Sequence, residues 1–139
     1  MQTAIPFGNY SFQLKNGEKH KQIFCLIRKK YVVFTPEEFV RQTVLAYLLF
    51  DKKIPNALIN VEKMILVNGR KKRFDILVFK EAKVDMIIEC KSPDVAINQT
   101  TFMQAAAYNL TLQANYFLLS NLKENYLLKL PTLEVVATF

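Results

Sequence analysis

The sequence predicts an α/β fold in which a mixed central β-sheet is flanked by helices and preceded by a β-hairpin extension. Two segments with apolar residues at helical spacing, 35–50 and 98–112, are separated by strand-like runs, an order typical of helices that cover a sheet. The run from Arg73 to Phe79 is apolar on both faces, as expected for a covered central strand. Its residues Phe74, Ile76 and Val78 are predicted to share one face. With 139 residues, 51% of them hydrophobic, the chain has the size of one domain.

The first 34 residues have the character of a β-rich extension. Strands are predicted at Tyr10–Leu14 and Gln22–Arg28, on either side of a tight turn at Asn16-Gly17, a pair that readily adopts the positive φ angles of a hairpin. A short strand is expected at Tyr31–Phe34. We therefore divide the single domain, 1–139, into this extension (1–34), a core (35–121) and a C-terminal strand with a tail (122–139).

A helix is predicted from Thr35 to Phe50. Thr35 is a good N-cap, Pro36 suits the first helical position, and Glu38 lies three residues after the cap, as in a capping box. The apolar residues that recur at helical spacing are Val40, Val44, Tyr47 and Leu48.

Three consecutive strands are predicted to follow as a meander. The first, Leu58–Val67, is joined by Asn68-Gly69 to the strand that contains Asp75, and Val84–Lys91 comes next. Pro93 ends this third strand because proline cannot continue the ladder of hydrogen bonds. A second helix and two further strands are predicted at Asn98–Leu112, Tyr116–Ser120 and Tyr126–Leu130.

The chain is basic and contains few cysteines. Its 19 Lys and Arg against 12 Asp and Glu give a formal net charge of +7, which favours polyanionic partners such as nucleic acid or acidic lipid. Cys25 and Cys90 lack a CxxC pattern and fit reduced thiols better than a disulfide. The first residues do not resemble a secretory signal, and no apolar run approaches the roughly 18 residues that span a bilayer. We therefore expect a cytoplasmic protein without a membrane segment.

Charged residues interrupt two of the apolar strands. Asp75 stands on the second strand of the meander, and Glu89 and Lys91 stand on the third, where aliphatic residues would be expected. If the turn is centred near Ala82, Asp75 and Glu89 face each other across an antiparallel pair with Cβ atoms about 5 Å apart. Strand residues alternate, so Glu89 and Lys91 point to one side and Cys90 points to the other. Two carboxylates and one ammonium are thus predicted to share one patch.

These residue types suit metal-dependent cleavage of a phosphodiester. Asp75 and Glu89 can hold Mg²⁺, with Mn²⁺ as a substitute, and the backbone carbonyl of Cys90 can supply a further oxygen ligand. A bound metal lowers the pKa of a water molecule, and Lys91 would orient or help deprotonate that water and offset negative charge. The single histidine, His20, lies in a polar hairpin, so a histidine-based mechanism is not expected. The alternative is a structural ion-pair cluster at the sheet edge.

Two further charged motifs lie near this patch. The motif Glu81-Ala-Lys83 repeats the spacing of Glu89-Cys-Lys91, but it falls in a polar turn and is interpreted as a solvated loop. The run that leads from the hairpin into the strand of Asp75 is basic and is the best candidate for contact with a phosphate backbone, which gives affinity without sequence choice. An ordinary solvated turn is the alternative. The residues of this run are Arg70, Lys71, Lys72 and Arg73.

The order of these motifs resembles the PD-(D/E)XK nuclease superfamily. The pattern consists of a glutamate on a first helix, then Asp75, then Glu89-Cys-Lys91, then Gln104 four residues before Tyr108 on the next helix. More narrowly, four segments between Thr35 and about Asn121 resemble the N-terminal nuclease domain of type I restriction enzyme R subunits in a short, stand-alone form. They are Thr35-Pro-Glu-Glu-Phe-Val-Arg-Gln42, Asn68-Gly-Arg-Lys-Lys-Arg-Phe-Asp75, Glu89-Cys-Lys-Ser-Pro93 and Tyr108-Asn-Leu-Thr111.

The resemblance implies a restriction-endonuclease-like core, dependence on Mg²⁺ and cleavage of DNA. It implies that Asp75 and Glu89 are metal ligands and that Lys91 is the catalytic lysine. Gln104 and Tyr108 would contact DNA or support the site. A polar edge on a helix that packs on the core is the alternative for these last two residues.

The resemblance also assigns a role to the first helix. Glu37 or Glu38 would be an auxiliary metal ligand or a support for the site, and Arg41 is counted among the residues that contact DNA or support the site. Glu37 lies four residues before Arg41, which matches the family pattern, but the adjacent Glu38 leaves the choice open. Helix capping and compensation of the helix dipole are the alternative for either glutamate.

Two functions of different classes follow from the sequence. The first is that of a Mg²⁺-dependent DNA endonuclease. The second is that of a DNA-binding or assembly module of a restriction or DNA-processing system, inactive without partner subunits, because R subunits use a helicase-like motor that this chain lacks. The expected partners are DNA, a second copy of the chain in a homodimer, and restriction-modification or helicase subunits. A third possibility is an ion-pair-stabilised protein with no role in nucleic-acid chemistry.

Overall fold

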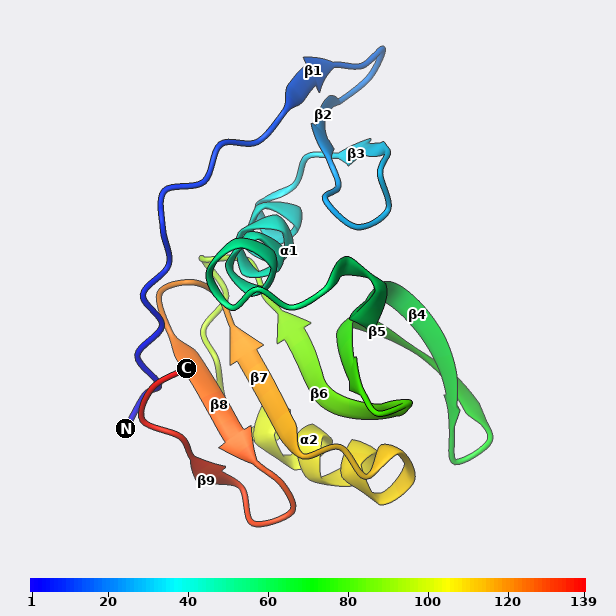
Figure 1. Ribbon diagram of the computed structural model, residues 1–139, viewed down its shortest axis with the longest axis vertical. Coiled ribbons are helices and arrows are strands. Elements are labelled where there is room, and N and C mark those ends of the chain that lie inside the picture. The colour runs from blue at the N-terminus through cyan, green and yellow to red at the C-terminus, as the bar shows by residue number, and fades with distance from the viewer.

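A six-stranded mixed sheet forms the centre of the structure, a computed structural model (Figure 1). It describes residues 1–139, except for the side chains of residues 101, 105, 106 and 108–111. Neighbouring strands of this sheet follow the chain order, and the β6–β7 pair is parallel whereas the other pairs are antiparallel. This arrangement confirms the predicted α/β fold. The strands are β4 (Ile59–Val67), β5 (Arg70–Lys80), β6 (Lys83–Cys90), β7 (Tyr116–Ser120), β8 (Asn125–Lys129) and β9 (Glu134–Val135).

A separate three-stranded antiparallel sheet precedes the core and lies beyond the start of the first helix (Figure 1). Its predicted tight turn is wrong, because neither Asn16 nor Gly17 has a positive φ and the loop spans residues 17–20. Gly17 is needed for another reason, since a Cβ at this position would lie 2.6 Å from the carbonyl oxygen of His20. The strands are β1 (Leu14–Asn16), β2 (Lys21–Phe24) and β3 (Tyr31–Val33).

Helix α1 (Pro36–Ala46) continues into a π-helical turn, η1 (Tyr47–Asp51). The hydroxyl of Thr35 accepts a hydrogen bond from the backbone N–H of Glu38 at 3.0 Å, which confirms the predicted N-cap. The reciprocal half of the capping box is wrong, because the Glu38 carboxylate is bound by arginine and glutamine side chains instead. A short 3₁₀ turn, η2 (Asn56–Leu58), leads from η1 to β4.

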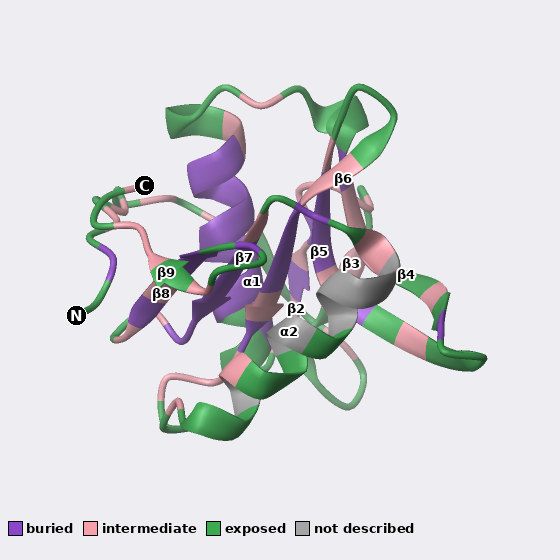
Figure 2. Cartoon of the chain, turned by 90° about the horizontal axis from the view of Figure 1, so that it is seen from below, coloured by how far each residue is buried: buried purple, intermediate pink, exposed green. Residues whose placement is uncertain are grey.

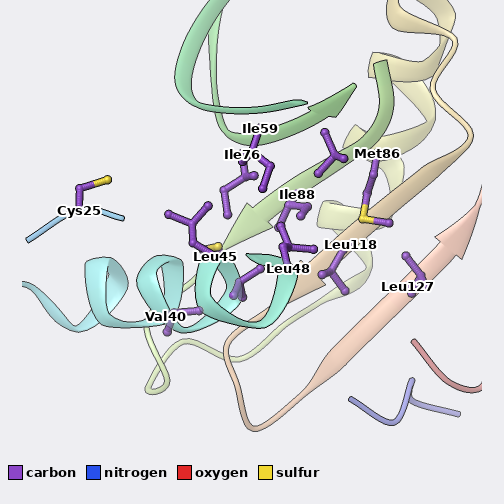
Figure 3. Close-up of a cluster of buried hydrophobic side chains, with 13 residues drawn as sticks. Cys25, Val40, Leu45, Leu48, Ile59, Ile76, Met86, Ile88, Leu118 and Leu127 are labelled. Carbon is purple, nitrogen blue, oxygen red and sulfur yellow. The ribbon is translucent and has the colours of Figure 1, made fainter. Parts of the chain in front are cut away.

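The two longer helices cover opposite faces of the six-stranded sheet. Under α1, buried Val40, Val44 and Leu48 pack on apolar side chains from β4 to β8 (Figure 3). Helix α2 (Gln99–Leu112) lies over the other face, where Phe102 packs against a second cluster that includes Phe117. Figure 2 shows that the buried residues gather in α1 and in the strands between the helices. In the described part of the chain, no helix has the length and apolar character that crossing a membrane requires.

The alternation of side chains along β5 breaks at Asp75. Ile76 belongs to the cluster under α1, whereas Phe74 and Leu77 both belong to the cluster under α2. The prediction that Phe74 shares a face with Ile76 is therefore wrong. The physical reason lies in the neighbouring strand, where Glu62 has φ +55° and the regular pairing skips the positions of Glu62 and Asp75.

The C-terminal segment of the chain contacts both β8 and the N-terminal residues. Strand β9, which the sequence did not predict, pairs with β8 at the edge of the sheet. The Thr3 hydroxyl donates to the carbonyl oxygen of Val136 at 2.6 Å and accepts from the N–H of Leu127 at 2.8 Å. The two termini therefore lie close together at this edge (Figure 1).

The β4–β5 hairpin follows the prediction. Asn68 and Gly69 have φ values of +53° and +77°, and Val67 pairs with Arg70 across the turn. Both positive φ angles are those that a two-residue turn needs to match the twist of the flanking strands.

Candidate active site

The register of β5 and β6 places Asp75 opposite Glu89. Ile76 pairs with Ile88, so the next positions along the two strands are Asp75 and Glu89. The strands are joined by a two-residue turn, Glu81-Ala82, in which both residues have positive φ. With this turn and an unbroken ladder, Asp75 would lie opposite Ile88 instead.

A β-bulge corrects the register. Val78 pairs with Met86 but Phe79 pairs with Val84, so Asp85 is the extra residue of β6. Asn115 holds this residue in place, since its backbone N–H donates to the Asp85 carbonyl oxygen at 3.0 Å and its side-chain amide donates to the Asp85 carboxylate at 2.8 Å. The bulge thus aligns the two carboxyl groups of the candidate site.

Asp75 is held from two sides. Its Oδ1 accepts a hydrogen bond from Nη2 of Arg41 on α1 at 3.0 Å, and its Oδ2 accepts one from the backbone N–H of Cys90 at 2.8 Å. The Cys90 side chain is fully buried, and burial raises the pKa of its thiol well above the ordinary value. Cys90 therefore meets the site through its backbone, while its thiol belongs to the core under α1.

Glu89 is a half-buried acid beside another acid. Its pKa is raised to about 8, first by burial, then by the charge of Asp75 and by a hydrogen bond with Asp75 that favours the protonated form. Within the described part of the chain, Oε1 of Glu89 is buried and has no hydrogen-bond partner. A carboxyl group in this setting would be stabilised as an anion by a cation placed between it and Asp75.

Two lysines bring positive charge to this pair of acids. The charges of Lys72 and Lys91 both act on Glu89 and favour its ionised form. The backbone N–H of Lys91 donates to the carbonyl oxygen of Ser120 at 2.9 Å, which fixes the end of β6 against β7. Lys91 is half-buried, so its ammonium group is placed near the carboxyl groups without losing contact with water.

The structure separates the two glutamates of the first helix. Glu37 is exposed, and its pKa is raised by partial desolvation and by the charge of Asp75, while Arg41 and Lys91 act in the opposite direction. Glu37 therefore lies within electrostatic reach of the candidate site. Glu38 is only 7% exposed and is enclosed by other side chains.

Glu38 belongs to a buried network of ion pairs that ends at Asp75. Its Oε1 is 2.8 Å from Nη1 of Arg41 and 3.2 Å from Nη2 of Arg28. The two arginines also share Glu62, at 3.2 Å from Arg28 and 3.4 Å from Arg41. Since Arg41 also binds Asp75, the network connects the N-terminal sheet, α1, β4 and β5.

The sequence did not single out Arg28 and Glu62 as site residues. Glu62 interrupts the apolar pattern of β4, and this charge within a strand was the available signal. Arg28 gave no signal, because it follows β2 and its contact with Glu62 joins residues 34 positions apart. Arg41, which the sequence assigned to DNA contact or support, is 6% exposed and supports the site.

The remaining predicted site residues are exposed, act on the acids from β5, or lie outside the described residues. Gln104 is exposed on α2. The side chain of Tyr108 lies outside the described residues. The predicted basic run belongs to β5, which begins at Arg70, and not to the turn. In this run Lys72 is half-buried and acts on Glu89, whereas the exposed residues are Arg70, Lys71 and Arg73.

The carboxylate oxygens of Asp75 and Glu89 suit a Mg²⁺ ion that is bound by only a few protein ligands. Among the described residues, no group of three or more His, Cys, Asp and Glu side chains is arranged to hold a metal ion. Mg²⁺ is commonly bound by one or two carboxylates, with water and substrate phosphate completing the octahedron. Asp75 and Glu89 meet this requirement, and the unpartnered Oε1 of Glu89 supplies the oxygen that a cation would use.

Glu89→Gln is expected to change the pH dependence of stability. Without metal, the folded protein keeps a proton on Glu89 up to about pH 8, while an unfolded glutamate with its ordinary pKa of 4.5 has lost it. The stabilising contribution is therefore complete below pH 4.5 and is lost as the pH rises to about 8, at about 1.4 kcal/mol per pH unit. Urea denaturation in EDTA across this range should show the fall for the wild type and remove it from Glu89→Gln. The exposed Glu81→Gln is the control, and identical pH profiles for Glu89→Gln and the wild type would contradict the expectation.

Comparison with known proteins adds one match. The model of the family described as type I restriction enzyme R protein N terminus matches residues 36–137. No curated protein matches the chain, and no solved structure matches it. The matched range contains α1, Asp75 and β6, and it leaves the three-stranded sheet outside.

Proposed function

Since the chain belongs to the family of type I restriction enzyme R protein N termini, we propose that it is a Mg²⁺-dependent DNA endonuclease. The observation that carries the proposal is the pair of acids Asp75 and Glu89, aligned by a bulge and accompanied by Lys91. A raised pKa caused by burial next to a second acid is typical of functional sites. The family match supports a role in a restriction system.

Different residues of the site have different roles in the proposed hydrolysis of a phosphodiester. Asp75, Glu89 and the backbone carbonyl of Cys90 would hold the metal, and Glu37 would assist from the helix. When bound, Mg²⁺ lowers the pKa of a water molecule and stabilises negative charge on the phosphate. Lys91 orients the attacking water through its ammonium group and offsets charge that develops on the phosphate oxygens.

The network behind the site orients the metal ligands. Arg41 fixes one oxygen of Asp75, and the N–H of Cys90 fixes the other. Such support keeps a ligand within the narrow geometry that catalysis needs. The exposed residues of the β4–β5 hairpin, Arg70, Lys71 and Arg73, are suited to phosphate contacts that position DNA.

Nicking of supercoiled plasmid DNA tests the endonuclease. The wild type is expected to nick in Mg²⁺ or Mn²⁺ and to be inactive in EDTA. Asp75→Asn removes a ligand charge while retaining the shape of the side chain, and it should lower the rate on the order of a hundredfold or more. Asp94→Asn, at an exposed acid after β6, is the matched control and should retain full activity. Equal nicking by the wild type and Asp75→Asn would identify a contaminating nuclease.

A second candidate function is that of a DNA-binding module that cuts only with partner subunits. The observation that favours it is that both oxygens of Asp75 are already hydrogen-bonded, one of them to the cation of Arg41. Metal binding at Asp75 therefore competes with an existing ion pair, and a partner could shift that balance. Salt-dependent DNA binding by a protein that never nicks in Mg²⁺ would support this function over the first.

A further inference from the structure

The N-terminal sheet and its connections form a strongly basic part of the chain. Residues 1–34 contain six Lys and Arg but one acid, Glu18, so they carry +5 of the formal net charge of +7. Arg28 is bound in the ion-pair network, and the other five are exposed. The family match begins at residue 36 and does not account for this concentration of charge. The exposed lysines are Lys15, Lys19, Lys21, Lys29 and Lys30.

One face of this sheet is open and combines cationic, amide and aromatic side chains. Lys15, Gln22 and Val33 lie in register across β1, β2 and β3, whereas Ile23, on the other face of β2, is fully buried. The ammonium group of Lys15 lies 4.2 Å from the centre of the Tyr31 ring. Cations and aromatic rings on an open surface are the combination with which proteins hold a nucleic-acid strand.

This face adjoins a second hollow that reaches Glu37 and Arg41 beside the candidate active site. A hollow of ≈ 530 Å³ at the β1–β2 hairpin is lined by residues 15–20, Gln22 and Val33. A second hollow of ≈ 480 Å³ is also lined by Val33, and it reaches Glu37, Arg41 and Ser92, the residue after Lys91. Val33 thus links the two hollows, so a chain bound over the sheet would run toward the acids.

We propose that the open face of the N-terminal sheet binds the phosphate backbone of a DNA strand and leads it to the candidate active site. Lys15 and Lys19 both line the hollow at the β1–β2 hairpin. These lysines supply the phosphate contacts. The inference rests on the proposed function, because it takes DNA to be the substrate.

The test replaces Lys15 and Lys19 by glutamine in the full chain and measures DNA binding. Anisotropy titrations of a labelled duplex and a labelled single strand of equal length are carried out in EDTA, where no cleavage occurs, over a series of salt concentrations. Each lost phosphate contact lowers the slope of log affinity against log salt by about 0.9 for a duplex, so the slope should fall by about 2. Affinity at low salt should fall about tenfold or more. The DNA form that shows the larger loss identifies the one held on the sheet.

A control of equal charge separates the surface from net charge. Lys80 and Lys83 are exposed at the end of the sheet opposite Cys90, and their replacement by glutamine removes the same two charges. The control should retain the wild-type slope. An equal loss in both double variants, or no loss in the first, overturns the proposal. Because binding is measured without metal, an absence of nicking in Mg²⁺ would count against endonuclease activity but not against DNA binding by the N-terminal sheet.

Discussion

Replacing Arg41 by methionine is expected to lower the free energy of unfolding by about 3 to 5 kcal/mol. Arg41 is 6% exposed and binds Glu38, Glu62 and Asp75. Methionine retains the apolar stem but removes the charge, so these acids lose a shared cation in a buried setting. Urea denaturation at neutral pH in EDTA measures the loss.

Two comparisons identify the cause of that loss. Arg70→Met removes an arginine from the exposed β4–β5 hairpin and should change stability by no more than about 0.5 kcal/mol. Asp75→Asn combined with Arg41→Met should cost less than the sum of the single changes, because the two residues contact each other at 3.0 Å. A loss below about 1 kcal/mol for Arg41→Met would show that water, rather than Arg41, compensates the acids.

Lys91→Ala is expected to lower the rate of Mg²⁺-dependent nicking by about 10²- to 10⁴-fold. The Lys91 charge acts on both Glu37 and Glu89, which places its ammonium group among the candidate metal ligands. Without it, the attacking water loses a positioning group and the phosphate loses a compensating charge. Initial rates of plasmid nicking at saturating Mg²⁺ measure the effect.

Two other lysines of the chain, Lys83 and Lys72, provide comparisons for Lys91→Ala. Lys83→Ala alters the other E-x-K motif, which is exposed in the β5–β6 turn, and should leave the rate unchanged. Lys72→Ala tests the second lysine whose charge reaches Glu89, and we expect a smaller loss because Lys72 precedes Asp75 on β5, whereas Lys91 also ranks among the main charges that act on Glu37. If Lys72→Ala abolished nicking while Lys91→Ala did not, the assignment of the catalytic lysine would be wrong.

The position of Arg28 gives the N-terminal extension a structural connection to the site. Its guanidinium group contacts Glu38 and Glu62, and its Nε donates to the sulfur of Cys25 at 3.2 Å. The loop after β2 is thereby fixed against α1 and β4. A strand of DNA held on the N-terminal sheet would rest on an element that is joined to the candidate metal ligand Asp75 through Arg41.

Local sequence patterns were sufficient to predict where α1 begins and where a two-residue turn joins β4 to β5. Thr35 caps α1 because its hydroxyl satisfies a free N–H of the first turn. Asn68-Gly69 closes the β4–β5 hairpin because both residues tolerate positive φ. The same reasoning failed at Asn16-Gly17, where the loop has four residues and Gly17 is required by a close backbone contact instead.

The amino-acid pattern alone was enough to identify the residues that are out of place in an apolar meander, and hence the candidate acids Asp75 and Glu89, because charge in a covered strand is costly and therefore informative. The way in which these two acids meet depends on contacts made in the folded chain. The bulge at Asp85 is held by Asn115, 30 residues away, and it brings Asp75 opposite Glu89 rather than Ile88. The choice between the helix glutamates also needed the fold, because Glu38 is enclosed by arginines from distant segments. Contacts between residues so far apart in the chain leave no local pattern, since they are fixed by packing rather than by backbone preference.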